Sequence, residues 1–257
     1  AAALIRGEAG TEVRLTIIRD GFKTDLSIIR GTVINKTVTY RIDGRIGYIS
    51  ISSFDNGTSR EFNEAIKEIN KAGIKKIILD LRGNPGGYVD EAVAVARKLI
   101  PKGIITTLVF KSEKYEDQVY YSNGNNPSYL VAVLVDEKTA SASEILAGAI
   151  EDSGAGFLIG QNTFGKGVFQ SIFSILTPEA YNKYNQLYGG KYVTNIEWMT
   201  YHGVIPEEDE IIGSVKLTTG YYLTPKGRSI NGIGLKPSLT EPNPTYPGGI
   251  DLSKVVP

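Results

Sequence analysis

The sequence contains no cysteine and only one histidine, His202. These shortages exclude a disulfide framework, a cysteine nucleophile and a metal site built on thiolates or on several imidazoles. The 257 residues carry 28 basic and 28 acidic side chains, so the formal net charge is zero. Binding to a nucleic-acid backbone needs a clustered excess of lysine and arginine. We therefore expect no nucleic-acid partner and no metal or other cofactor.

Long apolar runs are also absent. No stretch reaches the 18 or so apolar residues that a membrane-spanning helix needs. No basic segment followed by an apolar one opens the sequence, so we expect no secretory leader within these residues, although a mature chain could already have lost one. The length is sufficient for a substantial core. The lack of cysteine is compatible with an extracytoplasmic bacterial enzyme.

The first 31 residues form a segment of their own. Apolar Val13, Leu15 and Ile17 alternate with polar residues, and Asp20-Gly21 follows as a turn before a second apolar stretch. This pattern predicts two strands joined by a hairpin turn. A piece of about 30 residues cannot bury a core alone. It must dock on the rest of the protein or belong to a truncated domain.

Strands and helices alternate in the remainder of the chain. Strands are predicted at 46–54, 75–81, 103–110, 130–135 and 156–160, and helices at 58–73, 89–100 and 141–150. Short connections between them predict an α/β fold with a mostly parallel sheet, right-handed crossovers and flanking helices. Ligands gather where such strands end and helices begin. Two loops have that position, RGNPGG at 82–87 and DEKTAS at 136–141.

Ser141 closes the second loop and opens a helix, between Ala140 and Ala142. A serine in this position is usually a helix cap. Small neighbours, however, leave its hydroxyl open to a substrate carbonyl, and a helix N-terminus offers N–H groups to a developing oxyanion. The glycine loop could supply a second donor. As a phosphate cradle the same loop is disfavoured, because the GK[ST] ending of a P-loop is missing.

A serine nucleophile needs a base, and two residues are candidates. His202 lies among aromatic residues shortly before Pro206, a setting typical of a packed or surface histidine. Lys166 lies between two glycines in TFGKGVFQ. An ordinary lysine has a pKa near 10.4 and is protonated, but burial disfavours the charged form. A solvated lysine in a turn is the alternative, and spacing alone does not decide between them.

Four motifs in order resemble the carboxy-terminal processing peptidases, or tail-specific proteases. They are LDLRGNPGG, TASASEILAGAIEDSG, IGQNTFGKGVFQ and YYLTPKGRSINGIGLKP, and together they span nearly all of residues 37–238. The resemblance implies that Ser141 is the nucleophile and Lys166 the general base, since the two keep the family's interval. It further implies that Gln170 holds or orients the lysine.

The same resemblance suggests supporting roles. The Ala142 N–H and a glycine of the RGNPGG loop would form the oxyanion hole, with Gly87 favoured over Gly86. Asp152 matches a family acidic position but is equally compatible with an ordinary residue at a helix end. Glu144 is expected to shape and cap the helix rather than to react. No metal or nucleotide is implied.

The resemblance also assigns domains. Residues 1–31 are similar to the end of a PDZ domain, and residues 32–257 to a serine protease domain of ClpP/crotonase-like architecture with a tyrosine-rich insertion at about 178–215. PDZ domains bind terminal carboxylates. The implied protein is an endopeptidase that cleaves substrates with accessible C-terminal tails through an acyl-enzyme. It would be extracytoplasmic, in the periplasm or cell envelope, with a membrane anchor outside this sequence and a tendency to form homo-oligomers.

A rival interpretation is a regulated or catalytically inactive homologue that acts as a peptide- or ligand-binding module. A pure binding module would not need Ser141, Lys166 and Gln170 together, so the intact set counts against it. A protease kept inactive by a misplaced Lys166 is compatible with the same residues, because catalysis needs the amine within about 3 Å of the hydroxyl.

Overall fold

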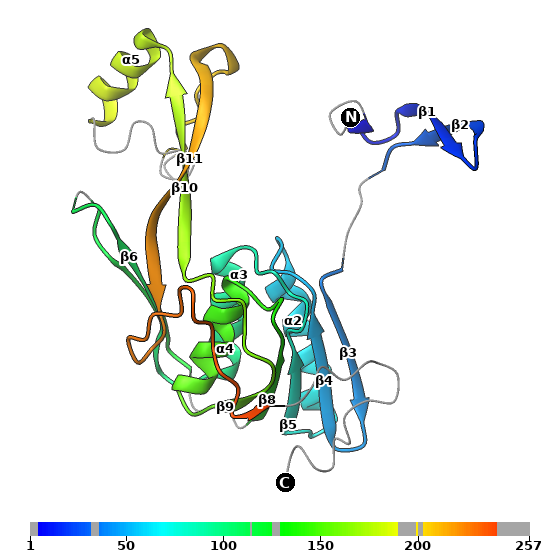
Figure 1. Cartoon of the computed structure of the whole chain (residues 1–257), viewed down its shortest axis with the longest axis vertical. Helices are drawn as coiled ribbons and strands as arrows, with labels where there is room; N and C mark the ends of the chain where they lie inside the picture. Colours follow the sequence, from blue (N-terminus) through cyan, green and yellow to red (C-terminus); the bar gives the residue numbers. More distant parts are fainter. Residues whose placement is uncertain are drawn as a thin grey trace. The chain divides into compact units, whose positions relative to one another are not determined.

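The computed structural model (Figure 1) describes residues 5–31, 36–113, 115–124, 129–189, 199 and 203–240. The chain separates into two compact units, Ala1–Lys36 and Thr37–Pro257. Among the helices in the described ranges, none combines the length and the apolar character that crossing a membrane requires.

The first unit is a β-hairpin. Its strands are β1 (Glu12–Arg19) and β2 (Phe22–Ile29), and they pair antiparallel. Asp20 and Gly21 both have positive φ, 52° and 80°, as a two-residue hairpin turn requires. The predicted strand–turn–strand is therefore confirmed. None of the described residues of this unit is buried, so they form no core of their own. A segment this short is not expected to form one.

Six strands form the main sheet of the second unit, in the order β12–β9–β8–β5–β4–β3. Their bounds are β3 (Val38–Asp43), β4 (Ile46–Ile51), β5 (Lys76–Asp80), β8 (Leu130–Val135), β9 (Gly156–Gly160) and β12 (Leu239–Thr240). Every neighbouring pair is parallel except β3–β4. β8 is an unbroken apolar run and β5 has an apolar centre, as expected of parallel strands buried on both faces. The predicted mostly parallel sheet is confirmed.

Three helices pack against one face of this sheet (Figure 1). They are α2 (Thr58–Lys71), α3 (Val89–Leu99) and α4 (Ala142–Asp152). Ile49, Leu79 and Val133 on this face share one apolar core with side chains of all three helices. A smaller cluster that contains Tyr48 and Ile78 lies on the opposite face. The helices and strands thus bring the ends of β5 and β8 next to the start of α4.

A second, antiparallel sheet has the order β10–β11–β6–β7. Its strands are β6 (Gly103–Phe110), β7 (Gln118–Ser122), β10 (Val168–Leu176) and β11 (Ile211–Leu223). The sequence predicts residues 103–110 in the parallel sheet, and this prediction is wrong. An apolar run identifies a strand without identifying its partner, and β7 provides β6 with a nearby hairpin partner.

The predicted insertion begins with α5 (Pro178–Tyr188), whose N-cap Thr177 accepts the Ala180 N–H at 3.2 Å. Tyr184 of α5 is part of a small apolar cluster that also contains Leu176 and Val204. Figure 1 shows α5 at the end of the β10–β11 ribbon that points away from the main sheet. The helix therefore does not cover that sheet. Residues 190–198 and 200–202, with most of the remaining aromatic side chains of the insertion, lie outside the described residues.

Candidate active site

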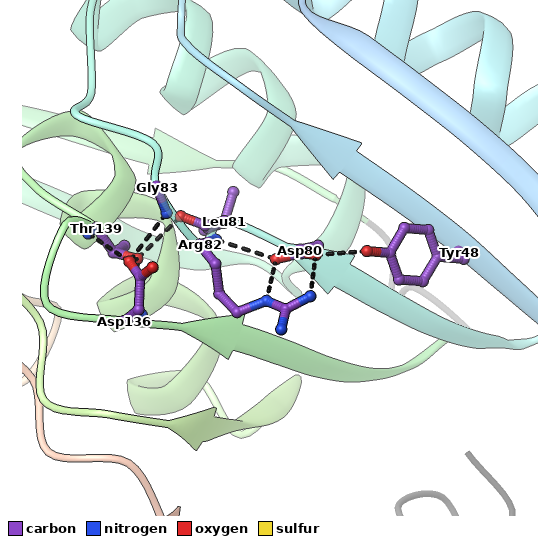
Figure 2. A network of polar contacts seen from close by, with 7 residues as sticks. All are labelled: Tyr48, Asp80, Leu81, Arg82, Gly83, Asp136 and Thr139. Atoms are coloured by element: carbon purple, nitrogen blue, oxygen red, sulfur yellow. Dashed lines mark hydrogen bonds and ion pairs between the residues drawn. The ribbon is translucent and has the colours of Figure 1, made fainter. Parts of the chain in front are cut away.

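The two loops identified from the sequence are tied together by Asp136. Its buried carboxylate accepts the backbone N–H groups of Lys138 and Thr139, both at 3.0 Å, and that of Gly83 at 2.9 Å. The Thr139 hydroxyl donates to the Leu81 carbonyl at 2.9 Å. Figure 2 shows the contacts of Asp136 and Thr139 with each other and with Gly83 and Leu81, at the carboxyl ends of β5 and β8. The glycine loop and the loop before Ser141 consequently hold one fixed relation to each other.

An ion pair between the partly buried Arg82 and the buried Asp80 fixes the start of the glycine loop (Figure 2). The Arg82 guanidinium donates to both oxygens of Asp80, at 2.9 and 2.7 Å, and the Tyr48 hydroxyl donates to the same carboxylate. Burial, together with the hydrogen bond to Asp80, raises the pKa of Tyr48 to about 12. The phenol therefore stays a neutral donor throughout the ordinary pH range.

Asn84 is fully buried and connects the glycine loop to the helix. Its amide nitrogen donates to the Ile51 carbonyl at 2.9 Å, and its backbone oxygen accepts the Ala140 N–H at 3.0 Å and the Ser143 hydroxyl at 3.2 Å. Its side-chain oxygen accepts the Gly86 N–H at 2.9 Å. This last contact leaves Gly86 without a free donor for an oxyanion.

Gly87 and Ala142 retain free backbone donors within the described residues. Gly87 lines the cavity that contains Ser141. On either side of it, the Gly86 carbonyl accepts the Phe54 N–H and the Tyr88 N–H donates to the Phe54 carbonyl. Ala142 is the first residue of α4, where N–H groups have no partner in the helix. The geometry therefore favours Gly87 over Gly86, the order that the sequence suggests.

Ser141 occupies a strained turn. It is the N-cap of α4 with φ 59° and ψ −121°, and positive φ is uncommon for a residue other than glycine. Such a conformation costs about 1–3 kcal/mol and persists only where the surroundings impose it. Gly86 makes the turn possible: a Cβ at that position would lie 2.8 Å from the Ser141 Cβ and 2.9 Å from the Ala142 nitrogen.

Glu144 joins the serine turn to the lysine turn. Its fully buried carboxylate accepts the Ser141 N–H and the Lys166 N–H, both at 2.9 Å. It also accepts the Gly165 N–H at 2.8 Å and the Thr163 hydroxyl at 2.5 Å. The sequence predicts only that Glu144 shapes and caps the helix. In the structure one carboxylate fixes the two backbone turns from which the candidate nucleophile and base project.

A cavity of about 760 Å³ brings the predicted residues together. Its lining includes Ser141, Lys166, Gln170 and Gly87. Lys166 is exposed, however, so the burial that the sequence argument requires is not observed. The reason is that Glu144 holds the lysine backbone while the side chain extends into an open cavity. Among the described residues, neither Ser141 nor Gln170 forms a hydrogen bond with the lysine amine.

Tyr222 donates a hydrogen bond to the side chain of Ser141. Its hydroxyl donates to the Ser141 Oγ at 3.1 Å, and its side chain lines the same cavity. The ring is buried and lies nearly parallel to Phe169, with 6.5 Å between ring centroids. Sequence reasoning missed this residue. The signal was its place in YYLTPKGRS, one of the four motifs, in which no single side chain had been given a role.

Asp152 does not line the cavity described above. Its side chain pairs with Arg228, and its carboxylate accepts the Lys226 N–H at 3.0 Å. Burial raises the pKa of Asp152, but hydrogen bonds from Thr224, Lys226 and Arg228 outweigh that effect and hold the pKa below its usual value. Asp152 thus fastens the end of α4 to the turn that follows β11. His202, the other candidate base, lies outside the described residues.

Comparison with known proteins identifies relatives of this arrangement. The model of "Peptidase family S41" matches residues 45–240. A probable CtpA-like serine protease of Staphylococcus aureus is 36% identical over 247 residues, which cover 94% of this chain and 42% of that protein. The protein of the same description in Staphylococcus epidermidis is 34% identical over 248 residues, covering 95% and 43%.

Solved structures agree. A photosystem II D1 C-terminal processing protease is 27% identical, with a TM-score of 0.61, and the match covers 92% of this chain and 57% of that one. The chain thus spans less than half the length of the two staphylococcal relatives. With most of its length matched by the family model and by relatives of more than 30% identity, this chain belongs to peptidase family S41.

Proposed function

We propose that this chain contains the catalytic core of a serine endopeptidase in which Ser141 is the nucleophile and Lys166 the general base. One observation carries the proposal: the buried Glu144 carboxylate accepts the backbone N–H groups of both residues. Both side chains therefore project into one cavity from turns that cannot move independently. Membership of family S41 supports the same reaction class.

The reaction would proceed through an acyl-enzyme. The Ser141 oxygen attacks the substrate carbonyl carbon while the hydroxyl proton passes to the Lys166 amine. The C–N bond then breaks, and the leaving amine takes that proton. Water attacks the resulting ester, again giving a proton to Lys166, and the Ser141 oxygen is released and reprotonated. Each oxyanion would be bound by the free N–H groups of Ala142 and Gly87.

Lys166 must be neutral to accept a proton, and a solvated lysine is normally charged. Because Lys166 is exposed in the open cavity, we infer that the substrate itself supplies the desolvation when it fills the space above the amine. Gln170, on the same cavity wall, would then orient the amine. In this proposal Ser141, Lys166 and Gln170 act together only when a substrate polypeptide fills the cavity.

We further propose the finer identity that the motifs suggest. The second unit would be a ClpP/crotonase-like protease core, and residues 1–31 would belong to a PDZ domain that captures accessible C-terminal tails. The exposed apolar side chains of the hairpin, such as Ile18 and Phe22, support a larger domain around it. The whole protein would be extracytoplasmic, membrane-anchored and a homo-oligomer. Accessibility of a tagged protein to external protease in intact cells tests the location.

The experiment that tests the reaction compares the digestion of unfolded casein by the wild-type chain, Ser141→Ala and Lys166→Ala. Lys98→Ala, which removes an exposed lysine of α3 away from the cavity, is the matched control. Loss of at least a thousandfold in both site variants, with the control unchanged, is expected. Equal digestion by wild type and Lys166→Ala would show that Lys166 is not the general base.

A second candidate function is a peptide-binding homologue without turnover. The observation in its favour is that the Ser141 oxygen is hydrogen-bonded to Tyr222 while Lys166 is exposed. Binding of casein without any cleavage by the wild-type chain would favour this alternative.

A further inference from the structure

The hydrogen bond between Tyr222 and Ser141 is built by the fold rather than by chance contact of two mobile side chains. Tyr222 is only 2% exposed, and its ring lies against Phe169 of β10. Its backbone N–H donates to the Gly167 carbonyl at 3.0 Å, directly after Lys166. Both the ring and the backbone of Tyr222 are therefore fixed, and among the described residues its hydroxyl is hydrogen-bonded to the Ser141 oxygen.

The direction of this bond matters for the chemistry. A serine hydroxyl has two lone pairs and one proton. Tyr222 donates to the oxygen of Ser141, so it occupies one lone pair and leaves the serine's own proton free for a base. Tyr222 and Lys166 therefore need not compete: the phenol donates to the oxygen, whereas the amine would take the proton from it.

The phenol also keeps its proton under working conditions. Burial raises the pKa of Tyr222 to about 12; the nearby Glu144 carboxylate adds to this, and the hydrogen bond to Ser141 opposes it. Glu144 is the charged group that acts on the phenol through space, and Lys166 lines the same cavity. A neutral phenol close to the nucleophile is a hydrogen-bond donor in the range where a serine protease works.

We propose that Tyr222 is a catalytic residue whose phenol stabilises the negative charge that develops on the Ser141 oxygen. This inference goes beyond the proposed function and rests on it. The charge appears twice: when Ser141 loses its proton to Lys166 and its oxygen forms the bond to the substrate carbon, and when that bond breaks in deacylation and the oxygen recovers a proton from Lys166. The phenol keeps its own proton in both steps, so no further co-reactant is needed.

The test is Tyr222→Phe, which removes one oxygen and leaves the ring against Phe169. Tyr221→Phe, at the adjacent and exposed position of β11, is the matched control. With p-nitrophenyl acetate, Tyr222→Phe is expected to show a burst of about one p-nitrophenol per Ser141 followed by turnover 10- to 100-fold slower than in the wild type. KM for a peptide substrate should change less than twofold, because the bond strengthens only in the transition state.

The outcomes separate the two proposals. Wild-type turnover in Tyr222→Phe while Ser141→Ala is inactive overturns the role of Tyr222 and leaves the nucleophile intact. Faster turnover in Tyr222→Phe overturns it as well, because the phenol would then restrain the serine. A full burst of p-nitrophenol from Ser141→Ala would contradict the proposed function itself, because Ser141 would then not be the nucleophile.

A second measurement covers the case in which Tyr222→Phe fails to fold. Replacing Tyr222 by 3,5-difluorotyrosine keeps the ring and the hydroxyl but makes the phenol more acidic. Turnover should then be lost at lower pH than in the wild type, because a phenolate cannot donate to Ser141. A pH–rate profile identical to that of the wild type would contradict the inference, since a purely structural tyrosine predicts no shift.

Discussion

Replacing Glu144 by glutamine tests whether one buried carboxylate holds the serine and lysine turns together. One carboxylate oxygen accepts the N–H groups of Ser141 and Lys166, and the other accepts from Gly165 and Thr163. A glutamine can preserve only one of these pairs. Its carbonyl best faces Ser141 and Lys166, while its NH₂ faces Thr163, whose hydroxyl can accept, and Gly165, whose N–H cannot.

This orientation of the glutamine determines the expected loss in the free energy of unfolding. Gly165 would keep a buried N–H without a partner, which costs about 1–3 kcal/mol, and two charge-assisted bonds would become weaker neutral ones. Removing a buried charge recovers part of the cost. We expect Glu144→Gln to lower the free energy of unfolding by about 2 kcal/mol. The lysine turn should loosen at Gly165, next to Lys166, and the reaction of Ser141 with a fluorophosphonate should slow about tenfold or more.

Urea denaturation followed by tryptophan fluorescence or circular dichroism measures the first quantity, and time-resolved labelling measures the second. Glu64→Gln is the control, because Glu64 is an exposed residue of α2 to whose side chain the structure assigns no hydrogen bond. If Glu144→Gln matched that control in both stability and labelling rate, the coupling of the two turns through Glu144 would be refuted.

Three further substitutions have defined outcomes. Gly86→Ala would place a Cβ 2.8 Å from the Ser141 Cβ, so fluorophosphonate labelling should fall at least tenfold while the protein stays folded; normal labelling would show that the turn can adjust. Arg82→Ala would leave the buried Asp80 carboxylate without its cation and should lower the free energy of unfolding by about 3 kcal/mol in urea denaturation, and a loss below 1 kcal/mol would contradict this. The pKa of Asp152 is lowered in the folded state, so its stabilising effect is present above the usual value near 3.9 and is lost as the pH falls through the folded value. Asp152→Asn should therefore be less stable than the wild type at pH 7, with the difference shrinking below about pH 4 in thermal melts; a difference that does not vary with pH would exclude this linkage.

The sequence predicts those features that local pattern encodes. The apolar run of β8 and the small residues around Ser141 are enough to place a serine between a buried strand and a helix. The hairpin at Asp20-Gly21 follows in the same way from alternation and turn chemistry. In each case neighbouring residues determine the outcome, so no knowledge of distant partners is needed.

Features that depend on distant partners could not be predicted. The bond from Tyr222 to Ser141 joins residues 81 positions apart, and Glu144 reaches Lys166 across 22 positions. The pairing of β6 is equally non-local, since an apolar strand suits either kind of sheet. Exposure of Lys166 depends on how far the cavity walls stand apart, and flanking glycines carry no information about that distance.

The β10–β11 ribbon carries two of the three groups around the Ser141 oxygen, and α4 carries the serine. Lys166 lies two residues before β10 and Tyr222 lies near the end of β11, so the proposed base and the phenol that donates to Ser141 are both carried by this ribbon, whereas the Ser141 oxygen lies at the N-terminus of α4. A change in the angle between this ribbon and α4 would move Lys166 and Tyr222 together relative to the Ser141 oxygen. Glu144 of α4 accepts the N–H groups of Gly165 and Lys166 just before the ribbon begins, so this one carboxylate limits such a movement.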